Sequence, residues 1–163
     1  MKRIKVILIF SSLFLPLIFI GCKSDGPKEI SVNIYLVAYE GSNFSGKTIG
    51  CNDILAPITK NVSVENNEVE SALNELLITK DSEVLKNFVK GPSLLVYQVT
   101  IANGIADVYL KGDFHISGVC DIPRIKEQLY ETAKQFSDIK KVKIYINNET
   151  LESYLSVSEL GFK

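Results

Sequence analysis

The sequence has one histidine, His115, and no cluster of lysine or arginine residues in its 163 positions. His115 and the nearby Cys120 supply two ligands, whereas a closed zinc site needs four, so we assign no metal site. The net charge is -1 and the basic residues are scattered, so no basic patch attracts nucleic acid. These shortages argue against a zinc-dependent protein and against a protein that binds nucleic acid.

The motifs of hydrolytic and redox catalysis are also missing. The sequence has no G-x-S-x-G motif, and Cys51 and Cys120 do not form a C-x-x-C pair. His115 can be grouped with Asp113 or Asp121 and one of many serines, but any chain of this composition permits such a grouping. We therefore predict that the chain is not an enzyme, and we assign no catalytic residue and no cofactor.

The N-terminus has the layout of an export signal. Residues 1–5 carry three basic side chains, and residues 6–20 form an almost continuous apolar run. A helix needs about 20 apolar residues to cross a bilayer, so this shorter run disfavours a permanent span. Residues 19–22, Phe-Ile-Gly-Cys, resemble the lipobox of bacterial lipoproteins, whose cysteine receives a diacylglyceryl group. The resemblance implies that residues 1–21 are a lipoprotein signal peptide and that Cys22 is lipidated.

A lipidated Cys22 anchors the chain to a membrane, because several acyl chains such as palmitate bind a bilayer stably. Residues 22–29 are then the anchor and a short polar tether, and the rest of the chain lies in the cell envelope, outside the cytoplasm. Lys23 stands where many lipoproteins of the inner membrane have aspartate, which favours an outer membrane if the cell has one. An uncleaved anchor helix with an incidental cysteine is the alternative.

One nucleotide-binding motif does occur. Gly41, Gly46, Lys47 and Thr48 match the G-x-x-x-x-G-K-[ST] spacing of a phosphate-binding loop. Such a loop opens a helix, whereas residues 48–52 do not continue easily as one, and nucleoside triphosphates are scarce outside the cytoplasm. The match stays open as an alternative to a plain glycine-rich loop.

The apolar pattern beyond the tether predicts one domain over residues 30–150, in a chain with 46% hydrophobic and 23% charged residues. The expected strands are 30–39, 94–102, 105–110 and 141–146, with a possible short strand at 58–64, and the expected helices are 67–78 and 121–135. The order βαββαβ predicts an α+β fold in which two helices cover one face of a single mixed or antiparallel sheet. Residues 151–163 form a C-terminal tail.

Asn103-Gly104 predicts a β-hairpin, because this dipeptide tolerates the positive φ angles of a type I′ turn. A two-residue loop pairs Ala102 with Ile105 and fixes the register of the two strands. The side chains expected on one apolar face are Tyr97, Val99 and Ile101 from the first strand and Ala106, Val108 and Leu110 from the second.

Segments 72–77, 104–110 and 128–142 resemble the GerMN domain, which is named after sporulation and germination proteins and occurs in many exported bacterial lipoproteins. Segments 50–57 and 118–124 resemble the paired cysteine-containing segments of one subgroup of these lipoproteins. The resemblance covers roughly residues 30–150 and implies an envelope-associated interaction domain with no established catalytic activity.

Cys51 and Cys120 are the two cysteines left once Cys22 is assigned to the lipid. An even pair of cysteines in an exported chain predicts a disulfide bond between them. Two buried free thiols are the alternative.

Export, lipidation and the lack of a catalytic motif together predict a membrane-anchored module for interaction or assembly, with an unidentified envelope protein as its partner. The alternative is a ligand-binding lipoprotein that recognises glycan or peptidoglycan fragments. A concave site with exposed aromatic rings, drawn from Tyr35, Tyr39, Tyr97 or Tyr109, would favour the ligand-binding alternative. An open strand edge or a flat apolar patch would favour protein assembly.

Overall fold

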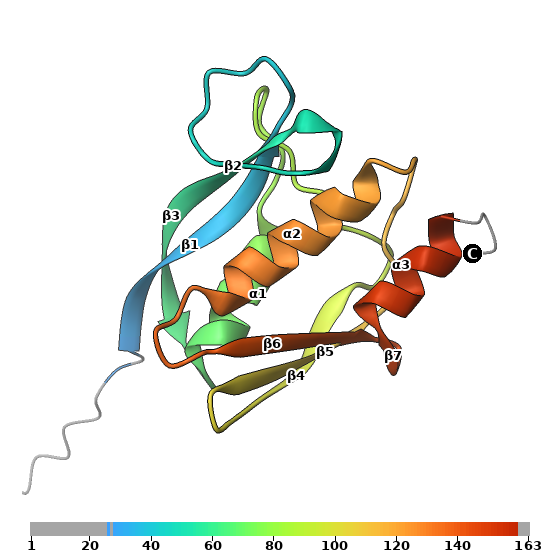
Figure 1. The fold of residues 1–163 in the computed structure, drawn as a ribbon. Helices are drawn as coiled ribbons and strands as arrows, with labels where there is room; N and C mark the ends of the chain where they lie inside the picture. Colours follow the sequence, from blue (N-terminus) through green and yellow to red (C-terminus); the bar gives the residue numbers. More distant parts are fainter. Residues whose placement is uncertain (1–25, 27, 160–163) are drawn as a thin grey trace, which may run out of the picture.

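Two β-sheets enclose a pair of helices in the computed structural model, which describes residues 26 and 28–159 (Figure 1). The expected signal peptide, residues 1–21, and the expected lipidation site, Cys22, lie outside the described residues. No helix in the described part of the chain is long and apolar enough to cross a membrane.

The first sheet is antiparallel and has the strand order β1-β3-β2. It consists of β1 (Lys28–Ala38), β2 (Lys47–Thr48) and β3 (Ile54–Val64), and β1 pairs with β3 along its whole length. The strand expected at 30–39 is confirmed as β1. The short strand expected at 58–64 is the second part of β3, which begins four residues earlier, at Ile54. The side chains of β1 that alternate into the core are Val32, Ile34, Leu36 and Ala38.

The second sheet is mixed and has the strand order β4-β5-β6-β7. Its strands are β4 (Leu95–Ala102), β5 (Ile105–Lys111), β6 (Lys141–Ile146) and β7 (Glu149–Thr150). Strands β5 and β6 run parallel, and parallel neighbours need a crossover connection. Helix α2 (Asp121–Lys134) supplies that crossover and packs on the core.

Helix α1 (Glu68–Ile78) confirms the helix expected at 67–78, and Asn67 is its N-cap. The Oδ1 atom of Asn67 accepts a hydrogen bond from the backbone N–H of Glu70 at 2.9 Å, which satisfies one of the unpaired amides of the first turn. Helix α3 (Leu151–Glu159) follows β7. The buried side chains of α3 are Leu151, Tyr154 and Leu155, so the folded unit continues past residue 150.

The α+β fold class is confirmed, and the structure differs from the expectation in the number of sheets. The expected single sheet is divided in two, and α1 and α2 lie between the two sheets and contact strands of both (Figure 1). The division has a physical cause, because the edge of β1 that faces away from β3 is hydrogen-bonded by side chains of α2 and of its C-cap Gln135, and not by a strand of the second sheet.

The hairpin of β4 and β5 has the expected turn and the expected pairing of Ala102 with Ile105. Asn103 and Gly104 both have positive φ angles, 53° and 76°. The expected position of Tyr97 is wrong, because a β-bulge between Val96 and Gln98 shifts the register. Val96 takes the place opposite Leu110, and the Tyr97 side chain is 58% exposed.

Candidate functional site

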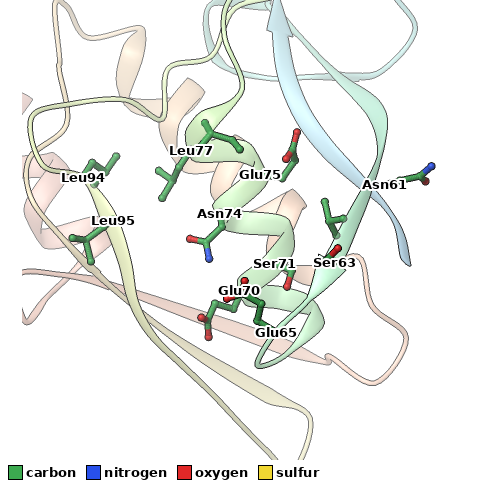
Figure 2. Close-up of a pocket in the computed structure, with 12 residues that line it drawn as sticks. Asn61, Ser63, Glu65, Glu70, Ser71, Asn74, Glu75, Leu77, Leu94 and Leu95 are labelled. Atoms are coloured by element: carbon green, nitrogen blue, oxygen red, sulfur yellow. The ribbon is translucent and has the colours of Figure 1, made fainter. Parts of the chain in front are cut away.

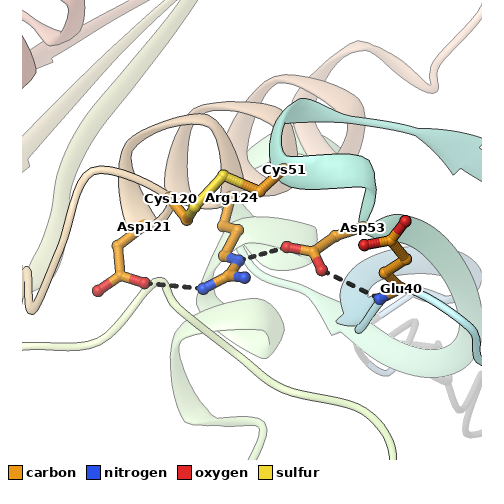
Figure 3. The surroundings of a disulfide bond; sticks show 6 residues. All are labelled: Glu40, Cys51, Asp53, Cys120, Asp121 and Arg124. Atoms are coloured by element: carbon orange, nitrogen blue, oxygen red, sulfur yellow. Dashed lines mark hydrogen bonds and ion pairs between the residues drawn. A yellow bond between two sulfur atoms is a disulfide. The ribbon is translucent and has the colours of Figure 1, made fainter.

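A disulfide joins Cys51, which follows β2, to Cys120, which precedes α2 (Figure 3). The Cα atoms of the two cysteines are 5.9 Å apart, within the usual range for bridged cysteines. Cys51 and Asn52 both adopt the left-handed region, with φ angles of 61° and 57°, which is an uncommon backbone conformation for residues other than glycine. The bridge therefore holds a strained turn against the start of α2.

Arg124 lies beside the disulfide and pairs with two carboxylates (Figure 3). Its Nε donates to Asp53 Oδ2 at 2.6 Å, and its Nη1 donates to Asp121 Oδ1 at 3.1 Å. The guanidinium carbon lies 5.0 Å from the ring centroid of Tyr39 and 4.7 Å from that of Phe88. Burial alone would lower the pKa of Arg124, but the hydrogen bond and charge of Asp53 outweigh it, so the pKa is raised.

We call the disulfide together with Asp53, Arg124 and Asp121 the clasp. Its ion pairs are shielded from water, since the side chains of Arg124 and Asp53 are 14% and 3% exposed. Every charged group in the clasp has an opposite charge within hydrogen-bond distance. The clasp thus joins the loop between β1 and β3 to α2.

The phosphate-loop match is not arranged as such a loop. Lys47 donates to Glu127 Oε2 at 2.6 Å and to Glu131 Oε1 at 2.9 Å, and these bonds raise the pKa of Lys47 to about 12. Thr48 lies in β2, and a three-residue 3₁₀ turn, Gly50–Asn52, follows in place of an α-helix. The motif lies at a sheet edge where its lysine is already paired.

His115 does not assemble a catalytic group with the acidic residues considered from the sequence. Its Nε2 lies 3.2 Å from Ser117 Oγ, and both side chains are exposed. Asp113 accepts a hydrogen bond from Tyr154, and Asp121 accepts one from the backbone N–H of Ser117 in addition to its pair with Arg124. Within residues 28–159 no carboxylate contacts the imidazole, and no three potential metal ligands cluster.

The outer edge of β1 is hydrogen-bonded by polar side chains of α2 and of its C-cap residue, Gln135. Gln135 exchanges two hydrogen bonds of 2.7 Å with the backbone N–H and C=O of Asn33. Thr132 Oγ1 accepts from the N–H of Tyr35 at 3.3 Å, and Gln128 Nε2 donates to the C=O of Tyr35 at 2.7 Å. Because these three side chains share one face of the helix, α2 takes the place of a neighbouring strand.

This role of α2 is not among the features predicted from the sequence, although the sequence carries a signal for it. Gln128 and Thr132 are fully buried, and polar side chains at helical spacing on a buried face need hydrogen-bond partners. Beyond them, Val37 and Lys86 exchange backbone hydrogen bonds of 2.9 and 2.7 Å. The edge of β1 is therefore closed to an added strand over this stretch.

Two other strand edges carry residues that discourage pairing. Strand β3 contains Pro57 and Lys60, and the part of β6 that β7 does not cover contains Lys141 and Lys143. Proline lacks a backbone donor, and an edge lysine must be desolvated before another strand can pair beside it. These edges have the features by which proteins avoid association.

Strand β4 is the exception among the strands that the structure describes, because only it has neither a charged residue nor a proline. It is one of the two edge strands of the second sheet, and β7 is the other. Since Ala102 pairs with β5 next to the turn, the backbone groups of Val99 and Ile101 point away from the sheet. No loop or helix in residues 28–159 hydrogen-bonds to them. Exposed apolar side chains of β4 are Leu95 at 44%, Tyr97 at 58% and Ile101 at 40%.

A groove of about 490 Å³ lies beside the beginning of β4, between α1 and β3 (Figure 2). Its apolar wall consists of Leu77, Ile78, Leu94 and Leu95, and its carboxylates are Glu65, Glu70 and Glu75. Glu75 is paired with Lys60 of β3 at 3.8 Å, and Glu65 and Glu70 form no ion pair with a described residue, so the groove carries a net negative charge. We call this feature the acidic groove.

The structure brings together two of the four tyrosines considered as ligand-binding candidates. Tyr97 and Tyr109 line one hollow of about 370 Å³ at the second sheet. Tyr39 lies against Arg124 of the clasp, and burial raises the pKa of Tyr35 in β1. The candidate surfaces are therefore the β4 edge with the acidic groove, and the hollow that contains Tyr97 and Tyr109.

Comparison with known proteins identifies a protein family and two solved structures with a similar fold. The family model Germane, described as sporulation and spore germination, matches residues 33–152. A structure of the tandem GerMN domains of the sporulation protein GerM from Bacillus subtilis is similar at 16% identity and a TM-score of 0.52, over 76% of this chain and 40% of that one. The first GerMN domain of the same protein is similar at 19% identity and a TM-score of 0.52, over 76% of this chain and 86% of that one.

No curated protein sequence matches the chain. The chain spans less than half of the tandem GerM structure and most of the single-domain structure. The likeness to GerM shows the fold, and the family model covers most of the chain. The chain therefore belongs to the Germane family of sporulation and spore germination, and its folded part is a GerMN-type domain.

Proposed function

We propose that the chain is a lipid-anchored protein of the cell envelope whose GerMN-type domain binds a partner protein at the β4 edge. The observation that carries the proposal is the contrast between strand edges. The edge of β1 is closed by α2, and β3 and β6 carry proline or lysine, whereas β4 has an uncharged apolar edge.

An unpaired edge of this kind is a template for strand addition. Backbone hydrogen bonds to Val99 and Ile101 supply affinity, and contacts with the exposed side chains of β4 supply specificity. The acidic groove extends this surface beyond Leu95. A segment that pairs with β4 and carries lysine or arginine near that end therefore has complementary shape and charge.

The test places a photo-crosslinking amino acid at Thr100, an exposed position of β4, in the full-length protein in its native membrane. We expect a discrete protein adduct whose yield falls about tenfold when Ile101→Lys is added. The new lysine must be desolvated before another strand can pair beside β4. A loss of about 1.4 kcal/mol in binding free energy corresponds to a tenfold lower affinity. The matched control is Val84→Lys, since Val84 is 54% exposed and lies outside β4.

Val84→Lys must leave the yield of the adduct unchanged. This result would show that the effect of Ile101→Lys depends on the position of the added charge and not only on its presence. Equal adduct yields from the Ile101→Lys protein and the unmodified protein would contradict strand addition at β4. So would the absence of any adduct from Thr100 when a probe at another exposed position gives one.

The lipid anchor is tested by the intact mass of the protein extracted from its native membrane. We expect the mass of residues 22–163 plus a diacylglyceryl or triacylated modification, because Phe-Ile-Gly-Cys ends the apolar N-terminal run. The Cys22→Ala variant should retain residues 1–21 and lack the acyl mass. An unmodified protein that keeps its N-terminus would show that Cys22 is not an anchor.

A further inference from the structure

We infer a saccharide-binding site on the outer face of the second sheet, in the hollow of about 370 Å³ next to the bulge of β4. This inference goes beyond the proposed protein partner and uses a different face of the same strand. The residues that line the hollow are Tyr97, Gln98, Tyr109, Leu110, Lys111, Asn147 and Asn148.

The bulge creates the aromatic part of the site. Without the extra residue, Tyr97 would oppose Leu110 on the core face, whereas in the structure it lines the hollow together with Tyr109 of β5. Bulges often re-aim a side chain next to a functional site. The apolar C–H faces of a pyranose ring pack on aromatic rings, so a hollow lined by two tyrosines suits a saccharide.

Tyr109 is held in place by its neighbour on β6. Its ring stacks on Tyr145, with centroids 5.0 Å apart and an angle of 12° between the planes. The two residues are direct partners in the parallel register of β5 and β6. A ring fixed in this way loses little further conformational freedom when a ligand binds.

The carboxamides of Gln98 and Asn148 complete the polar part of the site. The third carboxamide of the hollow, that of Asn147, is already hydrogen-bonded to Gly112. Its Nδ2 donates to the C=O of Gly112 at 2.8 Å, and its Oδ1 accepts from the N–H of Gly112 at 3.2 Å. The side chains of Gln98 and Asn148 make no hydrogen bond within residues 28–159. A carboxamide both donates and accepts, which matches the hydroxyl and acetamido groups of an N-acetylated sugar.

Lys111 selects among such sugars. Its Nζ lies 3.5 Å from the ring centroid of Tyr97, and it forms no ion pair with a described residue. By contrast, Lys143 on the same sheet is paired with Asp107 at 3.5 Å. A cation held over an aromatic ring at the rim of the hollow favours a ligand with a carboxylate. The structure thus fits an N-acetylated saccharide that carries a carboxylate, a chemistry found in bacterial cell walls.

The experiment is isothermal titration of the full-length protein in detergent with two disaccharides. One contains N-acetylglucosamine and N-acetylmuramic acid and carries a carboxylate, and the other, N,N′-diacetylchitobiose, is neutral. We expect the acidic disaccharide to bind at least fivefold more tightly. Tyr97→Ala should weaken its binding at least tenfold, and Lys111→Met should abolish the preference for the acidic disaccharide.

Two variants serve as matched controls. Phe44→Ala removes a partly exposed ring, and Lys140→Met removes an exposed lysine, both outside the hollow. Both should bind as the unmodified protein does, and the thermal midpoints of all variants should agree within a few degrees. Absence of binding at 10 mM of either sugar, or equal binding by Tyr97→Ala and the unmodified protein, would overturn the inference. A preference for the acidic sugar that survives Lys111→Met would overturn the role of Lys111.

Discussion

Replacing both bridge cysteines, Cys51→Ser with Cys120→Ser, is expected to lower the free energy of unfolding by about 4 kcal/mol. The bridge joins positions 69 residues apart, and a cross-link over so long a loop removes much of the conformational entropy of the unfolded chain. Native domains of this size are stable by about 5–15 kcal/mol, so the loss is a large part of the total.

The loss also has a local component in the folded state. Without the bridge, the positive-φ turn at Cys51 and Asn52 is held against α2 only through the neighbouring ion pair of Asp53 with Arg124. The measurement is urea unfolding of the variant and of the unmodified protein, each with and without a thiol reductant. Reduction should bring the unmodified protein to the stability of the variant and leave the variant unchanged. A difference below about 1 kcal/mol between the oxidised and reduced forms would contradict this expectation.

Local periodicity was enough to predict most of the secondary structure. Alternation of apolar residues located β1 and β6, helical spacing located α1 and α2, and Asn103-Gly104 fixed the turn of the hairpin. These features depend on neighbours within a few residues, whose interactions the sequence displays directly. Even there, the bulge at Tyr97 changed the face of one side chain, because the sequence carries no local mark of an extra residue in a strand.

The division into two sheets depends on contacts that are distant in the sequence. Gln135 and Asn33 are 102 residues apart, and Thr132 and Tyr35 are 97 apart, yet their hydrogen bonds close the outer edge of β1 to the second sheet. The same limit applies to the clasp. The pairing of its cysteines could be predicted because only two remain once Cys22 is assigned to the lipid. The position of Arg124 between Asp53 and Asp121 could not be predicted without the three-dimensional structure.

The two halves of the molecule thus have different roles in the proposed function. The clasp and the polar face of α2 make the first sheet a closed scaffold, with its strand edge satisfied from within. The second sheet presents an open edge at β4 and a polar, aromatic face at the bulge. The proposed interaction surfaces therefore lie on β4, and the clasp stabilises the part of the domain that supports them.

Arg124→Met is expected to lower the free energy of unfolding by roughly 3–5 kcal/mol, because it leaves Asp53 and Asp121 as buried carboxylates without their cation. Methionine keeps part of the apolar stem and removes the guanidinium that lies over the rings of Tyr39 and Phe88. Arg124→Lys should lose less, since it keeps the charge but cannot bond both carboxylates with a planar guanidinium. Urea unfolding of the oxidised proteins measures both losses.

The decisive control combines Arg124→Met with Asp53→Asn and Asp121→Asn. Removing a whole buried charge cluster costs less than removing one member, so the triple variant should recover at least half of the loss. The losses from Arg124→Met and from the cysteine variant should be shared only in their local component, because the ion pairs and the bridge hold the same loop against α2, whereas the entropy of the unfolded chain does not depend on Arg124. If the triple variant were no more stable than Arg124→Met, unpaired charge would not be the cause of the destabilisation, and lost packing around Arg124 would explain it instead.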